Sequence, residues 1–77
     1  MTNKEFLSII QKEASSADYN RYLKQLVYKK ISSDDNIAIF EVTNKYIASW
    51  IKSKYTNVIQ HCFEIYDGTK PTIEIKI

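Results

Sequence analysis

The sequence predicts an α+β fold in a single domain, residues 1–77, and two observations carry this prediction. Apolar residues recur every three or four positions from residue 46 to residue 63, which is typical of an amphipathic helix. Residues 72–77 alternate between polar residues and isoleucine, as in a strand with one buried face. With the shorter segments before them, these give the order α-α-β-β-α-β, a small three-stranded sheet covered by three helices.

Two short helices are expected at the start of the chain. The first should run from about residue 3 to residue 14, because Thr2 and Glu5 have the spacing of a capping box. Two serines interrupt it, and Ser15 with Asp18 repeats that spacing. A helical hairpin follows from the short break. The apolar residues are Phe6, Leu7, Ile9 and Ile10 in the first helix and Tyr19, Tyr22, Leu23 and Leu26 in the second.

Two strands are expected next. Residues 26–32 contain Val27, Tyr28 and Ile31, which favour a strand, while two lysines indicate a solvated side. Residues 33–36, Ser-Asp-Asp-Asn, are typical of a turn because their side chains bond their own backbone. Residues 37–42 form the second strand, paired with the first as a hairpin.

The longest helix should begin after Thr43 or Asn44, either of which can cap it. Its end is expected at Asp67-Gly68, since glycine enters the left-handed region at little cost. The last strand, residues 72–77, should have its isoleucines inward. A right-handed crossover would return it parallel to the second strand; if it lay beside the first, every neighbouring pair would be antiparallel. The helical stripe comprises Tyr46, Ile47, Trp50, Ile51, Tyr55, Val58, Ile59, Cys62 and Phe63.

The composition excludes several classes of protein and selects none. Hydrophobic residues make up 44% and charged residues 26%, which is an ordinary globular balance. The net charge of +2 is too small to indicate strong phosphate binding. We expect a cytoplasmic chain without contact to a membrane, because neither a secretory signal nor a long apolar run is present. Because the sequence ends on a strand, we expect it to be part of a longer protein.

The inventory of reactive residues argues against catalysis. His61 is the only histidine and Cys62 the only cysteine, so a metal site or a catalytic triad lacks partners. Neighbouring helical positions point about 100° apart, so we expect His61 in solvent and Cys62 in the core. Gly68 is the only glycine, which excludes a glycine-rich phosphate loop. We therefore expect no cofactor and no enzymatic activity.

Two aromatic residues of the long helix are open to a functional interpretation. Trp50 lies within the apolar stripe, which favours a core position over a stacking or anchoring role. Tyr46 lies in the first turn, where it can either anchor a partner or pack the helix start against the second strand. Lys45, Lys52 and Lys54 could form a basic side of this helix, although a solvated face is favoured.

Three segments together resemble the N-terminal domain (domain I) of the bacterial replication initiator DnaA. Residues 18–23, Asp-Tyr-Asn-Arg-Tyr-Leu, followed by Leu26, are similar to that family's second helix. Residues 42–55 resemble its "PN-aromatic…W…KY" segment, with Thr43 where the family usually has proline. Residues 70–75 are similar to its final strand. The resemblance covers essentially the whole chain and implies a KH-like fold.

The resemblance implies a hub that assembles the replication initiation complex. Its expected partners are the replicative helicase DnaB, regulators of the DiaA/HobA type, DnaA itself and, weakly, single-stranded DNA. The ATPase and origin-recognition regions are expected further along the full-length protein. For helicase and regulator binding it points to Asp18, Arg21, Asn44, Lys45 and Tyr46, and for single-stranded DNA to Lys45, Lys52 and Lys54.

The residue that the resemblance implies for self-association departs from the family pattern. The family uses a tryptophan in the first helix, and that position aligns with Asn3 in this sequence. Phe6, one turn later, is the nearest aromatic residue and could substitute for it.

Two other hypotheses remain at this stage. One is a KH-like module that binds single-stranded nucleic acid, supported by six tyrosines and the helical lysines but lacking the GXXG loop. The other is a structural cap without a partner surface.

Overall fold

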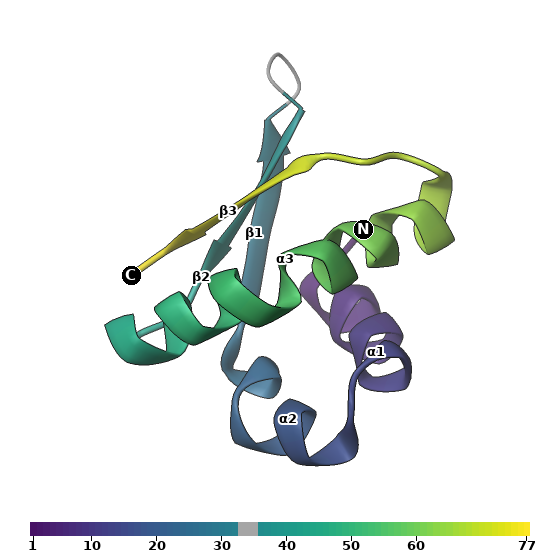
Figure 1. The fold of residues 1–77 in the computed structure, drawn as a ribbon. Helices are drawn as coiled ribbons and strands as arrows, with labels where there is room; N and C mark the ends of the chain where they lie inside the picture. Colours follow the sequence, from purple (N-terminus) through teal and green to yellow (C-terminus); the bar gives the residue numbers. More distant parts are fainter. Residues whose placement is uncertain (33–35) are drawn as a thin grey trace.

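The structure is a computed structural model that describes residues 1–32 and 36–77 (Figure 1). It confirms the α+β fold and the element order α-α-β-β-α-β. Three positions of the turn predicted at 33–36 lie outside the described residues. The fourth, Asn36, has a φ of 52°, a conformation that asparagine tolerates better than most residues.

The two N-terminal helices begin at the predicted caps. Helix α1 (Asn3–Glu13) has a complete capping box, in which Thr2 and Glu5 accept each other's backbone N–H. Helix α2 (Ser16–Arg21) has only half of one: Ser15 accepts the N–H of Asp18 at 3.1 Å, while the Asp18 carboxylate accepts from α3. Helix α2 is shorter than predicted and continues as one 3₁₀ turn, Leu23–Gln25.

The sheet contains strands β1 (Val27–Ser32), β2 (Ile37–Glu41) and β3 (Thr72–Lys76), in the order β1-β2-β3. Strands β1 and β2 are antiparallel, with a bulge between Tyr28 and Lys30. Strand β3 is parallel to β2, as the crossover predicted, and also pairs with it. The alternative placement beside β1 is therefore wrong. Helix α1 packs along β1 instead, where Asn3 Oδ1 accepts the Tyr28 N–H at 2.7 Å.

Helix α3 (Lys45–Asp67) is the longest element. Asn44, not Thr43, caps it: its Oδ1 accepts the N–H groups of Tyr46 and Ile47 at 2.8 and 3.2 Å. The helix ends at Gly68, whose φ of 80° lies in the left-handed region and whose N–H donates to Glu64.

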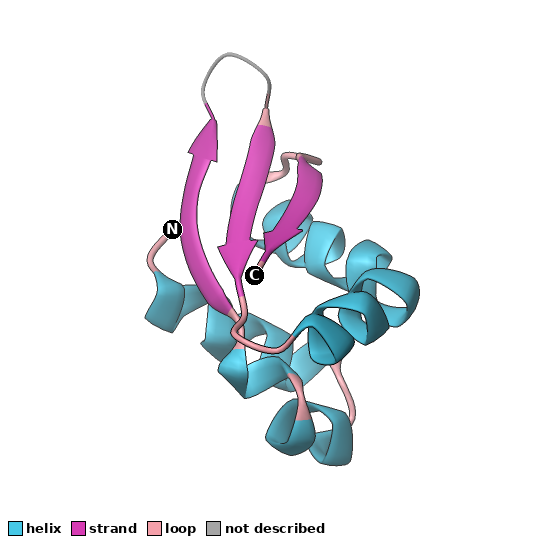
Figure 2. Cartoon of the chain, turned by 90° about the vertical axis from the view of Figure 1, so that its left-hand side faces the viewer, coloured by secondary structure: helices cyan, strands magenta, loops and turns pink. Residues whose placement is uncertain are grey.

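The helices gather on one side of the sheet and leave its other face open (Figure 2). Four aromatic rings form the centre of the core, Phe6 from α1, Tyr28 and Phe40 from the sheet, and Phe63 from α3, with centroids 4.8–6.4 Å apart. Of the isoleucines predicted to point inward from the last strand, Ile75 is buried and Ile73 half-buried. Ile77 is 74% exposed because β3 ends before it, so that part of the prediction is wrong. No helix in the described part of the chain combines the length and apolar character needed to cross a bilayer.

Candidate functional site

Tyr46 is the most exposed tyrosine on the surface of α3. Its side chain is 76% exposed in the first turn of the helix, and the Lys45 Nζ lies 5.4 Å from its ring centroid. A tyrosine that packed the helix start against β2 would be largely covered, so that interpretation is wrong. The exposed ring offers apolar area with a polar end, which is the type of side chain that anchors protein partners.

Trp50 lies one turn after Tyr46 and is half-buried. Its ring centroid is 4.0 Å from that of Tyr22 and 5.5 Å from that of Tyr55, and Lys54 Nζ lies 5.8 Å from it. The predicted core position is thus only partly correct: Trp50 packs against the core from its edge. Through Tyr22, Trp50 links α3 to the segment that follows α2.

Asp18 and Tyr55 make a second link between α2 and α3. The Tyr55 hydroxyl donates to Asp18 Oδ2 at 2.5 Å. This hydrogen bond to the carboxylate, together with burial, raises the pKa of Tyr55 above its usual value. Asp18 is half-buried with one oxygen engaged, while Arg21, one turn later, is exposed.

We call the region formed by α2, Tyr22 and the first three turns of α3 the α2–α3 face. It comprises the predicted residues Asp18, Arg21, Asn44, Lys45 and Tyr46, and in addition Tyr22, Trp50, Lys54 and Tyr55. The sequence pattern did not select Tyr22 or Tyr55 as site residues, because each matched an apolar stripe. Their link to the site appears only when α2 and α3 pack together.

The lysines of α3 do not form one basic side. At about 100° per residue, Lys54 projects on one flank of the Tyr46–Trp50 pair, while Lys45 and Lys52 project on the other. All three are exposed. The exposed lysines agree with the favoured interpretation of a solvated face, and their charges lie on both flanks of the aromatic pair.

The two residues considered for self-association have structural roles here. Phe6 is fully buried at the centre of the aromatic core, so the hypothesis that it offers a surface aromatic is wrong. Asn3 is half-buried, and its side chain accepts the Tyr28 N–H.

His61 and Cys62 lie as predicted, in solvent and in the core. His61 Nε2 is 3.6 Å from Glu13 of α1, and Nδ1 is 3.8 Å from Glu64, one turn later in α3; both contacts are at the surface. Burial raises the pKa of the Cys62 thiol to about 12, so it is protonated and unreactive at neutral pH. Among the residues that the structure describes, no group of three His, Cys, Asp or Glu side chains is placed to hold a metal ion.

Comparison with known proteins gives consistent matches along the chain. The family model described as the DnaA N-terminal domain matches residues 4–64. The chromosomal replication initiator protein DnaA of Aliarcobacter butzleri is 82% identical over 77 residues, all of this chain and 18% of that protein. DnaA of Campylobacter curvus is 40% identical over 75 residues, 97% of this chain and 17% of that protein. The chain thus spans less than a fifth of these relatives.

A solved structure shares the fold. The match is to the crystal structure of a HobA-DnaA (domain I-II) complex from Helicobacter pylori, with a TM-score of 0.82 and 22% identity. The alignment covers 97% of this chain and 94% of the matched one.

Proposed function

The chain belongs to the DnaA N-terminal domain family, and from this we propose that it is a non-catalytic protein-interaction domain of a chromosomal replication initiator. We further propose that it docks a regulator of the HobA type through the α2–α3 face. The fold shared with the DnaA part of a HobA-DnaA complex supports this class of partner.

The single observation that carries the proposal is the exposure of Tyr46. Because Tyr46 is 76% exposed, it contributes little to the stability of the fold. It lies in the first turn of a 23-residue helix, which Tyr55 and Trp50 link to α2 and the segment after it. An anchor held in this way loses little conformational freedom when a partner covers it. Exposed Arg21 and half-buried Asp18 would supply the polar rim of such an interface.

The proposal is tested by titrating the chain with its cognate HobA-type regulator in a calorimeter. Tyr46→Ala should weaken binding by about 2 kcal/mol or more while leaving the unfolding midpoint unchanged. Tyr66→Ala is the matched control, because Tyr66 is also an exposed tyrosine of α3 but lies at its other end. Equal losses in both variants, or no loss in Tyr46→Ala, would contradict the assignment of the site.

Substitutions at Asp18 distinguish a contact with the partner from a link within the domain. Asp18→Asn removes the charge but keeps an oxygen that can accept from Tyr55, whereas Asp18→Ala removes both. If the charge contacts the regulator, both variants should bind weakly. If Asp18 only positions α2, Asp18→Asn should bind like the wild type and Asp18→Ala should not.

Recruitment of the replicative helicase DnaB is proposed through the same face. An exposed anchor that serves both partners predicts competition between them. Adding the regulator should release the helicase from the immobilised initiator, and Tyr46→Ala should weaken both complexes. Simultaneous binding of the two proteins would show that the helicase uses another surface. Any self-association must use residues other than buried Phe6.

A second candidate function is weak binding of single-stranded DNA. It is favoured by lysines over two aromatic rings, Lys45 over Tyr46 and Lys54 over Trp50. Affinity for an oligonucleotide should then fall as salt rises, and Lys45→Gln with Lys54→Gln should flatten that dependence. Binding that does not respond to salt would remove this candidate.

A further inference from the structure

Strand β3 forms the second edge of the sheet (Figure 2). It contacts β2 and α3, and no strand within the described part of the chain pairs with its outer edge. The edge at β1 is different, because α1 packs along it and Asn3 accepts the Tyr28 N–H there. An unpaired edge presents backbone donors and acceptors with which a further strand can pair.

The hydrogen bonds to β2 show which backbone groups of β3 point outward. The Thr72 N–H donates to Asn36 and the Lys76 carbonyl accepts from Val42, so positions 72, 74 and 76 point toward β2. Because the backbone groups of successive residues point to opposite sides of a strand, positions 73 and 75 present theirs at the outer edge. Ile77, the next position in this alternation, is 74% exposed.

The side chains of β3 alternate in the same way between the two faces of the sheet. Ile75 is buried on the helical face, while Glu74 and Lys76 are exposed on the open face. Lys76 lies opposite Glu41 of β2, but Glu41 pairs with Lys29 at 3.8 Å. Within the described residues, neither Glu74 nor Lys76 has an ion pair. The edge strand thus presents one free charge of each sign, two positions apart.

A second copy of the chain fits this edge in one antiparallel register. If the two Ile75 residues lie opposite each other, the outward backbone groups meet, and Glu74 of each copy lies opposite Lys76 of the other. Centring the pair on Glu74 or on Lys76 instead places like charges opposite each other, which is destabilising. Centring it on Ile73 places Pro71, which has no N–H, where a donor is required. Charge and backbone therefore select the same register.

We propose that the chain forms a symmetric dimer through β3, in which two antiparallel β3 strands join the two sheets into one. Exposed Ile77 of each copy then lies beside Ile73 of the other and extends the apolar, helical face of the sheet. The contact is closed by its two-fold symmetry, because each copy contributes the same edge. The remaining edge of each sheet is β1, where the contact with α1 opposes the addition of a third copy.

Sedimentation equilibrium of the 77-residue chain over a concentration series tests the dimer. We expect a reversible monomer–dimer equilibrium below about 1 mM, because an interface of one strand from each copy is small. Glu74→Lys and Lys76→Glu each bring like charges together at two places and should weaken the dimer at least about fivefold. Lys30→Glu, which changes an exposed lysine of β1, is the matched control and should leave it unchanged. A chain that stays monomeric, or an equal effect of all three variants, would overturn the proposal.

Mixtures of the variants test the register. In a heterodimer of Glu74→Lys with Lys76→Glu, opposite charges again face each other at both places, so this mixture should dimerise about as strongly as the wild type. A mixture of Glu74→Lys with Lys30→Glu has the same total charge but restores only one place, so it should dimerise more weakly. Two mixtures that dimerise equally would show that net charge, and not the proposed pairing, controls association.

Amide hydrogen exchange locates the contact on the chain. The Ile75 N–H should become protected as the chain concentration rises, whereas the Glu74 N–H, which points toward β2, should be protected throughout. Protection of Ile75 that does not depend on concentration would contradict the dimer.

The dimer can be tested separately from the proposed function, because these measurements use the chain without a regulator. Tyr46→Ala should leave the monomer–dimer equilibrium unchanged. A dimer that is lost in Tyr46→Ala would place the contact on the α2–α3 face and overturn the assignment to β3.

Discussion

The contact between Tyr55 and Asp18 shows how two residues separated by 37 positions fix part of the surface. Asp18 belongs to α2, a helix of only six residues without a fully buried side chain. So short a helix has little stability of its own, and its position depends on contacts with the neighbouring elements, α1 among them. Two further contacts link it to α3: the hydrogen bond from Tyr55 to Asp18, and the packing of Tyr22, the residue after α2, against Trp50.

Tyr55→Phe should therefore loosen α2 without disturbing the core. We expect a loss of about 1 kcal/mol in the free energy of unfolding at pH 7. Because the pKa of Tyr55 is raised in the folded state, its contribution is fully present below the unfolded value, about pH 10, and is lost as pH rises through the folded pKa. The stability difference between wild type and variant, measured by urea denaturation, should shrink above pH 10.

The comparison of wild type with Tyr55→Phe also corrects for other groups that titrate at alkaline pH. Burial raises the pKa of both Tyr28 and Cys62, so both also destabilise the fold at high pH. They are present in both proteins and cancel in the difference. A difference that stays constant with pH would contradict the role given to the Tyr55 hydroxyl.

Individual residues were predictable where one helix determines their environment. His61 and Cys62 were placed correctly, since adjacent positions of an amphipathic helix face different ways. Tyr46, Trp50 and Phe6 were harder, because an aromatic residue matches the stripe whether it is covered or not. For Trp50 the deciding contact is Tyr22, which belongs to another part of the chain.

At the scale of elements, the ends of α3 depend on two residues with different chemistry. Asn44 accepts two N–H groups at the start, and Gly68 takes up the left-handed conformation at the end. A side chain at position 68 would meet no atom within 4 Å, so steric contact does not require the glycine. The glycine is required instead by the left-handed backbone conformation at this position.

Gly68→Ala should lower the free energy of unfolding by about 1 kcal/mol, because alanine pays the full cost of a positive φ. Gly68→Asn should cost less, since asparagine tolerates this region. Thermal unfolding followed by circular dichroism measures both. Equal midpoints for the wild type and Gly68→Ala would show that the chain ends the helix in another way.

The sequence predicted the type and order of the elements well and their arrangement less well. Helices and strands followed from periodicity and capping, with ends within one or two residues for most elements. The position of β3 did not follow, since its alternating pattern is satisfied beside either strand. The free edge of β1 is already in contact with α1, and the Asn3 side chain accepts a hydrogen bond from Tyr28, 25 positions away. Such packing is not visible in the pattern of one strand.

At the scale of the whole molecule, stability depends on one small core. A domain of this size rarely has more than about 3–5 kcal/mol of net stability. Phe6 contacts the other three rings at its centre and is fully buried. The core therefore has little reserve against the loss of this side chain.

Phe6→Ala should cost about 3–5 kcal/mol and leave the chain largely unfolded at 25 °C, while Phe6→Leu should remain folded with reduced stability. Circular dichroism and urea denaturation distinguish these outcomes. A folded Phe6→Ala variant with wild-type stability would contradict the buried position.

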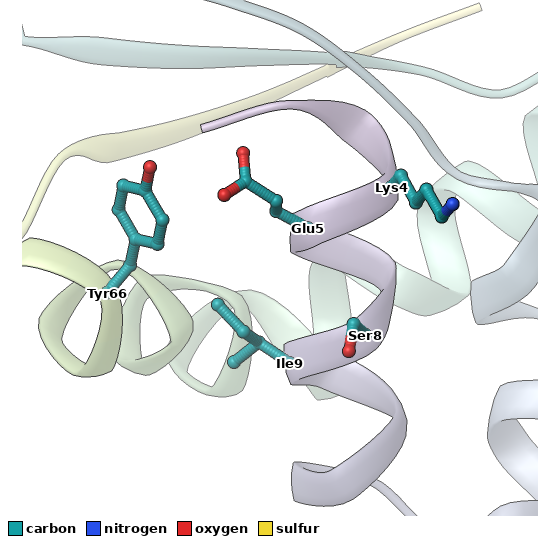
Figure 3. A pocket seen from close by; sticks show the side chains of 5 residues that line it. All are labelled: Lys4, Glu5, Ser8, Ile9 and Tyr66. Carbon is teal, nitrogen blue, oxygen red and sulfur yellow. The ribbon is translucent and has the colours of Figure 1, made fainter.

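The surface also has an arrangement that no local pattern could predict. The exposed Tyr46 and the groove lined by Lys4, Glu5, Ser8, Ile9 and Tyr66 lie toward opposite ends of α3, and the groove combines residues from segments distant in sequence (Figure 3). Periodicity identified α3, but it could not identify which residues of α3 contact other elements at the surface.

The hydrogen bond that the Tyr28 N–H donates to Asn3 has a consequence for how the domain behaves at high protein concentration. Strand β1 lies at the edge of the sheet, and an edge with free amides can recruit strands from other molecules and start aggregation. Here the Asn3 side chain of α1 already accepts one of those amides. A strand from another molecule must therefore displace the start of α1 before it can pair there. This hydrogen bond therefore opposes the formation of fibrils by intermolecular pairing along β1.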